Sequence, residues 1–438
     1  MATNLLETYK QRLAISEQVY AKRHMNESMP SSKALATAKC LDNITRFINE
    51  AFENSVGTQR SAMGEWKKFT LNLTTVAVPN LIAFDLVKVY PMSSITGYIS
   101  YVKFTAGSNK GATKQGDVFN DPFRLGKVDV NYTAASVIED FKTSTGDAAK
   151  TDFVMTWTPV VNVAKVLVDG VEKTLTTDYT VEGNTVKFTS APGANKDIKV
   201  AYTYDNVVIP QNDLPILNAE MAGIALTAKA RRIAVYYSQI AAFQAKTDYG
   251  FDLAAQLAEK AVGQLNYEID TEVTDLLINN ADADADLVWS KTLPVGVNKA
   301  DHYEGFMEIV EIARQKIYDR TKRYAPNYML IASNILPILT FIKGFKAAPA
   351  GQVNGPYFAG TLDALKVYVT PNIEPGKFVI GVNSDDMEAT AAVYAPYMPI
   401  VPTQLLGYAD GGMSQGFSTM YDLKILNKDL LVAGRVTA

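Results

Sequence analysis

The most suggestive chemical pattern in the sequence is a run of alternating aspartates, Asp282, Asp284 and Asp286. Alternate carboxylates supply the first ligands of a calcium-binding loop, which also needs a glycine at its sixth position for a sharp turn and a bidentate glutamate at its twelfth. This chain has Leu287 and Leu293 at those two positions. The turn and the last ligand are therefore missing, and we expect no metal site there.

Groups that could catalyse a reaction are equally sparse. The sequence contains two histidines, His24 and His302, and none of the motifs GxGxxG, GxxxxGK[ST] or HExxH. His302 follows Asp301, but it could act as a base only beside a nucleophile, so we favour a hydrogen-bonded surface histidine. A pair of carboxylates would leave no motif, and a hydrolase that uses such a pair stays an open alternative. The sequence indicates a protein that is not an enzyme and needs no cofactor.

The composition is that of an ordinary globular protein. Of the 438 residues, 47% are hydrophobic and 20% are charged. The net charge of −4 gives the whole chain no strong attraction to nucleic acid. No apolar run approaches the roughly 18 residues of a membrane span, and the N-terminus lacks the layout of a signal peptide, so we expect a cytoplasmic protein without membrane contact. The single cysteine, Cys40, lies on a helical pattern and should be buried.

The elements that must position these residues begin with an N-terminal arm. Residues 1–68 show helical spacing of apolar side chains and carry ten Lys/Arg against seven Asp/Glu, a balance of +3. A solvated helical surface is the simplest explanation of that balance. Weak contact with phosphate or with an acidic partner is the alternative.

A long helix is predicted over residues 251–280, which we call the spine. Its apolar residues recur every fourth position and then continue on the same face: Leu253, Leu257, Ala261, Leu265, Ile269, Val273, Leu276 and Leu277. The opposite face, which should be solvated, carries Glu259, Lys260, Glu268, Asp270 and Asp275. At 1.5 Å per residue such a helix would be roughly 45 Å long.

Strands are predicted between the arm and the spine. Alternation at 69–73 and at 95–104 is typical of half-buried strands, with an apolar block at 79–92 between them. Residues 106–126 are predicted to form the tip of a long hairpin whose return arm lies near 127–133. Such a hairpin cannot bury both of its faces, so we expect a neighbour, such as another subunit, to cover it.

Residues 148–209 predict a small antiparallel β-sandwich, because short β-rich runs are separated by Asp-Gly, Gly-Asn and Pro-Gly turns. Tyr179, Tyr202 and Tyr204 could stack on sugars if they were exposed, but packing in the core is the interpretation we favour. After this segment, 217–229 predicts a strand and 231–245 a helix. The C-terminal part predicts a helix at 303–320, strands near 327–333, 366–370, 378–382 and 391–394, and paired strands in 420–438.

The order of these parts resembles the Hong Kong 97 capsid fold, and the chain resembles the major capsid proteins of tailed bacteriophages, most closely the T-even group. Three stretches carry the resemblance: PNLIAFDLVKVYPMSSITGYI at 79–99, the helix pair at 228–273 that contains the spine, and four strand segments between 326 and 402. The fold class implied is α+β. The implied parts are an N-terminal arm 1–78, a peripheral domain starting at 79–92, an extended loop 93–147, an all-β insertion 148–209, the rest of the peripheral domain 210–300, an axial domain 301–413 and C-terminal strands 414–438.

The resemblance implies a structural role, in which copies of the chain form hexamers and pentamers of an icosahedral or prolate head around double-stranded DNA. Vertex, portal, scaffold or decoration proteins are further implied partners, and the virion is the implied location after assembly in the host cytoplasm. Matches to a maturation-protease pattern at 5–7, 15–17 and 48–50 leave open whether an N-terminal segment is removed. The alternative function is another phage structural or carbohydrate-binding protein that uses the β insertion.

Contacts between subunits are expected where the extended loop crosses a neighbour. The candidate residues are Lys103, Lys110, Lys114 and Arg124 on the loop, and Glu259, Glu268 and Asp275 on the spine of the neighbour. Exposed ion pairs contribute roughly 0–1 kcal/mol each, so these pairs should mainly set the register of the contact.

Overall fold

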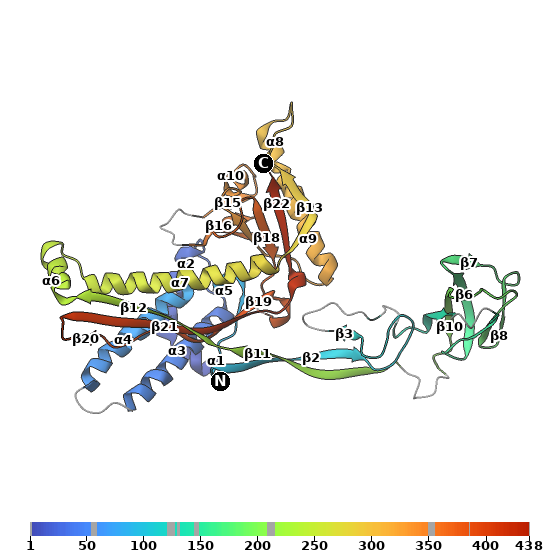
Figure 1. Cartoon of the computed structure of the whole chain (residues 1–438), viewed down its shortest axis with the longest axis horizontal. Helices are drawn as coiled ribbons and strands as arrows, with labels where there is room; N and C mark the ends of the chain where they lie inside the picture. The colour runs from blue at the N-terminus through green and yellow to red at the C-terminus, as the bar shows by residue number, and fades with distance from the viewer. Residues whose placement is uncertain are drawn as a thin grey trace. The chain divides into compact units, whose positions relative to one another are not determined.

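The computed structural model describes residues 2–53, 59–120, 128, 132–143, 149–207, 215–348, 355–384 and 386–437. The chain divides into two compact units, one made of 1–99 and 224–438 and the other of 100–223 (Figure 1). Helices and strands are mixed in the first unit, while strands dominate the second. The predicted α+β class is therefore confirmed.

Four helices open the first unit: α1 Ala2–Thr8, α2 Lys10–Arg23, α3 Ser31–Glu53 and α4 Gln59–Ala77. Leu41, Ile44 and Ile48 of α3 are buried against Leu71 of α4, so each helix has one apolar side. The strand predicted at 69–73 is wrong, because these residues belong to α4. Three alternating apolar residues fit one helical face as well as a strand, and the longer helical context decides.

A five-stranded sheet follows in the order β1-β19-β21-β12, with β20 also paired to β21. Its strands are β1 Lys88–Val89, β12 Lys229–Ser238, β19 Ala392–Pro402, β20 Leu406–Gly407 and β21 Gly412–Ile425, and the short helix α5 Ala83–Leu86 precedes β1. The helix predicted at 231–245 is wrong over its first half, since β12 pairs with β21 along ten residues and only α6 Gln239–Asp248 is helical. Alternation of Ile233 and Val235 with exposed neighbours fits a strand, and the pairing with β21 selects it.

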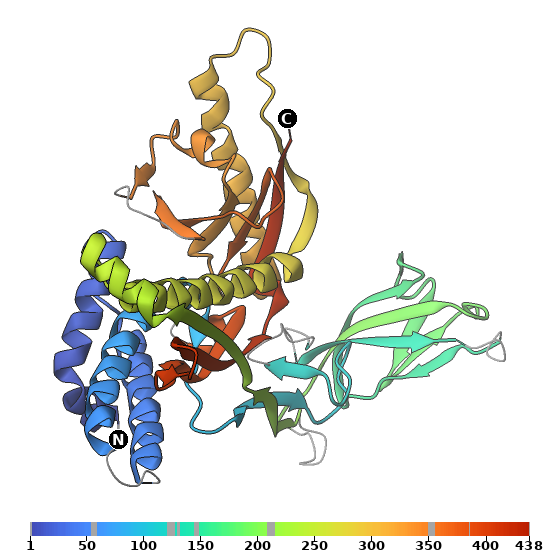
Figure 2. The same cartoon turned by 60° about the vertical axis from the view of Figure 1, so that its left-hand side comes forward.

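The spine is observed as α7 Leu253–Asn280, which begins at an N-cap where Asp252 accepts hydrogen bonds from the backbone of Ala254 and Ala255. The predicted helix is confirmed. Its first half packs on the five-stranded sheet through Ala261 and Leu265. Its second half enters the main core, and the helix lies along the sheet in both views (Figures 1 and 2). The prediction that Asp270 faces solvent is wrong, because its carboxylate is buried and accepts from the Ala83 amide at 3.0 Å.

A seven-stranded mixed sheet forms the rest of the first unit, in the order β13-β22-β18-β14-β17-β16-β15. Its strands are β13 Asp282–Ser290, β14 Tyr328–Ala332, β15 Phe345–Ala347, β16 Tyr357–Leu362, β17 Leu365–Thr370, β18 Lys377–Gly381 and β22 Leu431–Thr437. The associated helices are α8 Lys299–Glu304, α9 Phe306–Thr321 and α10 Leu336–Leu339, and α9 packs on β13 and β22 (Figure 2). Five consecutive residues of β14 are buried, as expected of a central strand covered on both faces.

The division of strands between the two sheets does not follow the predicted domain boundaries. These were placed at residue 300, between the peripheral and axial domains, and at residue 413, between the axial domain and the C-terminal strands. β13, expected in the peripheral part, is an edge strand of the seven-stranded sheet, and β19, expected in the axial part, belongs to the five-stranded sheet. β21 and β22 were expected to pair, but they enter different sheets. Pairing between strands far apart in sequence is not visible in local periodicity.

The second unit contains a ribbon and two small sheets. The ribbon is formed by β2 Thr96–Ala106, β3 Val118–Asn120 and β11 Leu217–Thr227, and β2 and β11 continue into the first unit. The sheets are β4-β10-β6-β7 and β5-β9-β8, from β4 Ser136–Lys142, β5 Asp152–Val154, β6 Val160–Val168, β7 Val171–Lys173, β8 Tyr179–Glu182, β9 Thr185–Phe188 and β10 Asp197–Tyr204. Their shared core includes Trp157, Val166 and Tyr202, as expected of a small β-sandwich.

Two predicted features of this unit need correction. The central strand β2 pairs with β11, which follows the sandwich in sequence, and with β3, which lies inside the predicted tip. Of the predicted return arm at 127–133 the structure describes 128, 132 and 133, none of them in a strand, and the other four residues lie outside the described residues. The sandwich also begins before 148, because β4 pairs with β10 along seven residues. The chain thus leaves along β2, forms the sandwich and returns along β11.

Candidate assembly surfaces

The alternating aspartates of β13 are engaged by cations of α9. Lys316 contacts Asp284 at 2.5 Å and Asp286 at 2.9 Å, and Arg320 contacts Asp282 at 3.2 Å. Alternate side chains of a strand point to the same side, so the carboxylates line up along the helix instead of surrounding an ion. Among the described residues, no group of three His, Cys, Asp or Glu side chains is arranged to hold a metal. The aspartates therefore fasten α9 to the edge strand.

The candidate catalytic residues have structural surroundings. His302 donates from Nε2 to the carbonyl oxygen of Ser290 at 3.0 Å and stacks on Trp289 with ring centres 4.8 Å apart, which confirms the hydrogen-bonded histidine. The stretch from Gly412 to Gly416 fits the nucleophile pattern GxSxG, which needs a sharp turn from strand to helix. Here Ser414 lies within β21, paired to strands on both sides. It is therefore not at a nucleophile elbow.

The basic residues predicted on the extended loop differ from one another in their surroundings. Across the ribbon, the ammonium of Lys103 lies 2.8 Å from a carboxylate oxygen of Glu220. The hydrogen bond that Lys103 donates in this ion pair lowers the pKa of Glu220. Lys114 is exposed. Arg124 lies outside the described residues.

Lys110 was expected at the surface, and it is buried instead. Its ammonium donates to the carbonyl oxygens of Tyr132 at 2.8 Å and Ala134 at 2.5 Å. It also lies over the rings of Trp157 and Tyr204, 5.3 and 5.2 Å from their centres. Lys110 therefore ties the loop after β2 to the core of the sandwich, and burial excludes it from the surface of the folded subunit.

The acidic face of the spine is partly neutralised within the chain. Glu259 is exposed, whereas Glu268 pairs with Arg231 of β12 at 3.3 Å. The same guanidinium contacts Glu272 at 2.5 Å, and Glu272 accepts a hydrogen bond from Tyr421. Asp275 is half-buried, and desolvation raises its pKa. Sequence reasoning missed Arg231 because the residue was assigned to a helix.

Exposed apolar side chains mark three surfaces. On the ribbon, Val102 is 43% and Met221 82% exposed. A second group includes Ile240, Phe243 and Tyr249, which are at least 70% exposed. They belong to α6 or follow it directly, and Figure 1 shows α6 at one end of the five-stranded sheet. The third is the loop 291–298 between β13 and α8, with exposed Leu293, Val295 and Val297. Clustered apolar side chains at a surface are typical of protein–protein contacts.

At this end of the five-stranded sheet, β12, β21 and β20 lie side by side. Tyr236 of β12 and Leu406 of β20 both lie opposite Ser414 of β21, one on each side. The rings of Tyr236 and Tyr408 are 6.3 Å apart. We use the name α6 tip for the surface formed by these side chains and those at α6. Its members are Tyr236, Leu406, Tyr408, Ile240, Phe243 and Tyr249.

The tyrosines considered for sugar stacking are part of the sandwich core. Tyr179, Tyr202 and Tyr204 are all buried, and Tyr202 donates to Glu139 at 2.8 Å. The packing interpretation is therefore confirmed, and these three rings offer no exposed platform to a sugar. Separately, none of the helices that the structure describes is long and apolar enough to span a membrane.

Comparisons with known proteins identify the family. A model of the family described as "Major capsid protein Gp23" matches residues 63–433. The chain is 22% identical to the major capsid protein of Vibrio phage KVP40, over 80% of this chain and 74% of that one. It is also 22% identical to the major capsid protein of Enterobacteria phage T4, over 85% of this chain and 77% of that one.

Among solved structures, the chain is similar to the capsid of Myoviridae phage XM1, with a TM-score of 0.37 and 8% identity over 72% of this chain and 90% of that one. The family match confirms the predicted structural role in the virion capsid. Because the family model covers most of the sequence, the chain belongs to the Gp23 major capsid protein family.

Proposed function

We propose that copies of this chain assemble into hexamers and pentamers, which close an icosahedral or prolate head around double-stranded DNA. The ribbon carries the proposal. Val102 and Met221 expose apolar surface on a long strand pair, and burying that surface against another subunit would be favourable. The α6 tip and the loop 291–298 offer further apolar surface of the same kind.

The ribbon of one subunit would lie on the spine side of its neighbour. Lys114 and Arg124 would then meet Glu259 and Asp275 of a second copy. Lys103 and Glu268 already have partners within the chain, so they would contribute only by exchanging those partners. Contacts of this head-to-tail kind generate closed rings when the rotation between subunits closes.

A charge on the ribbon tests this arrangement. Met221→Glu should leave the subunit folded, because the side chain is 82% exposed, and should abolish particles, because a carboxylate would be buried at the contact. Val171→Glu, on an exposed strand of the sandwich, is the matched control and should assemble normally. Particle yield would be measured by negative-stain microscopy and sedimentation. An unchanged yield for Met221→Glu would refute the ribbon contact.

Deletion of residues 106–116 is a less specific test, because it removes Lys110 from the core of the sandwich. The proposal as a whole is tested by microscopy of the purified protein, where closed shells or sheets with five- or six-fold centres are expected. A stable monomer that binds glycans or turns over a substrate would contradict it.

The N-terminal helices would face the packaged DNA. Lys10, Lys22 and Lys39 are exposed on α2 and α3 and could make weak, non-specific phosphate contacts. The remaining parts of the proposal are assembly in the host cytoplasm, contact with vertex, portal, scaffold or decoration proteins, and the lack of any enzymatic activity. Binding of duplex DNA that weakens steeply with salt, and weakens further in a Lys10→Glu, Lys22→Glu, Lys39→Glu variant, would support the DNA contact.

A further inference from the structure

A pocket of about 400 Å³ lies in the first unit at the edge of the seven-stranded sheet where β22 ends, close to the point marked C in Figure 1. The end of β22, the residue after β13, the segment after β14 and the turn before β18 contribute to its lining. The lining residues used below are Lys291, Asn334, Pro375 and Arg435. Four segments that are far apart in the sequence thus form one pocket.

The frame of the pocket is fixed by hydrogen bonds of the backbone. The amide of Val436 donates to the carbonyl oxygen of Gly376 at 2.6 Å, and the amide of Lys291 donates to that of Thr437 at 2.9 Å. Gly376 has a φ of +83°, and a Cβ atom there would lie 2.3 Å from the carbonyl oxygen of Val436, so the turn requires glycine. The amide of Gly376 in turn donates to Oδ1 of Asn334 at 3.0 Å. The walls of the pocket are therefore formed before any ligand arrives.

The charged side chains in the lining are positive. Lys291 and Arg435 are both exposed, and the described residues that line the pocket include no carboxylate. Lys377 of β18 lies directly opposite Arg435 across the antiparallel pair of strands. Side chains at such positions lie on the same face of a sheet, where like charges repel each other. An anion bound beside them would relieve this repulsion.

The acidic side chains nearby do not neutralise this group. None of Lys291, Lys377 and Arg435 forms an ion pair within the part of the chain that the structure describes. The aspartates of β13 are already paired with two cations of α9. Glu374, in the turn before β18, is exposed and is a single carboxylate beside three cations. The group therefore keeps positive charge that is available to another molecule.

The pocket also offers a hydrogen-bond donor and apolar surface. A backbone amide occupies Oδ1 of Asn334, so Nδ2 of this exposed side chain remains a donor without a partner among the described residues. Pro375 is exposed in the lining, and the aliphatic stem of Arg435 adds further carbon surface. Val288 of β13 is 46% exposed and lies opposite Arg435 on the other side of β22. An anionic ligand that carries apolar groups next to its charge fits both features.

We propose that this pocket is a docking site for an acidic segment of a partner protein, in which apolar side chains adjoin Asp or Glu. A carboxylate of the segment would accept from Lys291, Asn334 and Arg435, and a guanidinium can donate two parallel hydrogen bonds to it. An apolar neighbour of that carboxylate would cover Pro375 and Val288. The inference does not rest on the proposed assembly, because it uses none of the apolar side chains through which the subunits are proposed to meet.

Fluorescence anisotropy with the purified, unassembled full chain tests the proposal. The probe is a fluorescein-labelled peptide of the sequence ELDLELD with an amidated C-terminus, so that all of its carboxylates belong to side chains or to the shared label. Two peptides with the same label are the matched controls, QLNLQLN without the acidic groups and ESDSESD without the leucines. We expect saturable binding of ELDLELD and an affinity about tenfold lower or less for each control, because one lacks the ion pairs and the other the apolar contact.

Two substitutions assign the binding to the pocket. Lys291→Gln and Arg435→Gln should each weaken the affinity for ELDLELD about tenfold, since glutamine keeps part of the aliphatic stem and lacks the charge. Arg435→Gln should melt no lower than the original protein, because it removes the repulsion with Lys377. Lys260→Gln, at an exposed position of α7, is the matched control and should bind the peptide unchanged.

Three outcomes would overturn the proposal. The first is that ELDLELD does not bind saturably. The second is that the protein with Arg435→Gln and the protein with Lys260→Gln bind this peptide equally well. The third is that ESDSESD or a duplex DNA of 20 base pairs binds more tightly than ELDLELD, which would make the pocket a general site for polyanions.

Discussion

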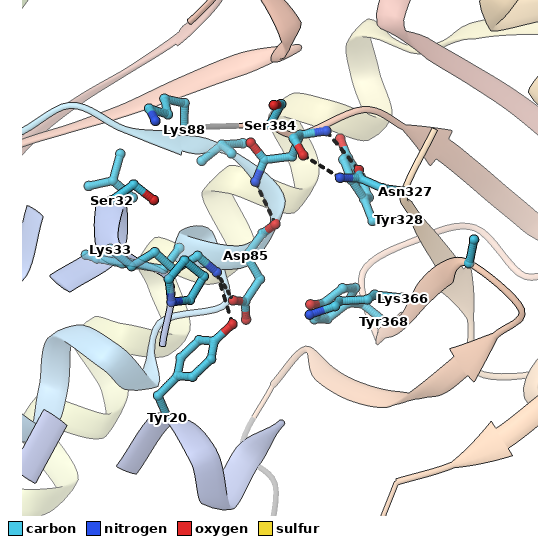
Figure 3. Close-up of a pocket in the computed structure, with 16 residues that line it drawn as sticks. Tyr20, Ser32, Lys33, Asp85, Lys88, Asn327, Tyr328, Lys366, Tyr368 and Ser384 are labelled. Atoms are coloured by element: carbon cyan, nitrogen blue, oxygen red, sulfur yellow. Dashed lines mark hydrogen bonds and ion pairs between the residues drawn. The ribbon is translucent and has the colours of Figure 1, made fainter. Parts of the chain in front are cut away.

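Replacing Asp85 by asparagine should detach the N-terminal helices from the rest of the first unit. Asp85 lies on α5 with a side chain that is 3% exposed (Figure 3), and its carboxylate is shared by Lys33 of α3, by Arg23 of α2 and by His24, which caps the C-terminus of α2. Two helices of the arm thus depend on one carboxylate. Asparagine has nearly the same shape but no charge, so the substitution tests the electrostatic contribution with little change in packing.

The expected loss is about 3–5 kcal/mol of unfolding free energy, which is the usual effect of removing one member of a buried ion pair. Most of it comes from the cations left behind. The side chains of Lys33 and Arg23 are only 16% and 18% exposed, so solvent screens them weakly. Lys33 also contacts Tyr20, whose hydroxyl lies 3.4 Å and whose ring centre lies 5.0 Å from the ammonium, and these contacts cannot replace a carboxylate.

The effect should depend on pH in a defined direction. Burial by itself raises the pKa of Asp85, but Lys33, His24 and Arg23 outweigh it and hold the pKa well below its usual range. A carboxyl group with a lowered pKa contributes stability above its unfolded pKa of about 3.9, and that stability is lost as the pH falls below this value. The difference between the original protein and Asp85→Asn should therefore be full at pH 7 and shrink in acid.

Urea unfolding of the unassembled chain, followed by circular dichroism at about pH 7 and pH 3, would measure this difference. Hydrogen exchange of α2 and α3 would show whether the loss is concentrated in the arm. Asp301→Asn, at an exposed position of α8, is the control and should change stability by less than about 0.5 kcal/mol. A loss below about 1 kcal/mol at pH 7, the range of an exposed pair, would refute the reasoning.

Three further substitutions test other buried groups. Asp270→Asn should stabilise the chain above pH 7 by up to about 4 kcal/mol, because burial raises the pKa of Asp270 to about 7 and ionising it in the folded state is unfavourable; the benefit should vanish below about pH 4 in urea titrations. Lys110→Met should lower the stability of the sandwich by about 2 kcal/mol in thermal unfolding, because two carbonyl oxygens lose their donor. Leu265→Ala should cost about 3 kcal/mol in urea, because it leaves a cavity between the spine and the five-stranded sheet.

Each of these has an outcome that contradicts it, and the last two have a matched control. A stability difference for Asp270→Asn that does not change with pH would show that the carboxyl group is not the one that titrates. Lys114→Met, at an exposed position in the same loop as Lys110, should have no effect; an equal loss in both variants would exclude the buried ammonium as the cause. Glu259→Ala is the surface control for Leu265→Ala, and equal losses would contradict the packing argument.

The features that could be predicted from the sequence are those written in local periodicity. The spine is the clearest case, because its apolar residues recur at helical spacing over many turns, and the observed helix runs over Leu253–Asn280. The helix α9 was predicted from the same helical spacing, and the buried strand at Tyr328–Ala332 from a short continuous run of mostly apolar residues. The order of such elements was enough to suggest the capsid family.

Strand partners were not predictable in this way. Residues 231–238 contain alternating side chains that also suit a short helix, and only the pairing of β12 with β21, nearly 200 residues later in the sequence, makes them a strand. The partner of β2 is likewise β11, which lies beyond the whole sandwich. Local pattern carries no information about which distant edge a strand will join.

The surroundings of single charged residues also depended on the folded chain. Asp270 and Asp275 lie little more than one turn apart on the spine, yet Asp270 is buried against the Ala83 amide while Asp275 remains half-exposed. Lys110 sits in a polar loop whose composition suggests solvent, and it is buried because Tyr132 and Ala134 bring two carbonyl oxygens to it. The sequence by itself determined which segments form helices and apolar faces. Which charges are buried, and with which partners, followed from long-range packing, because a charged group is withdrawn from water only where distant segments supply its counter-charge or hydrogen bonds.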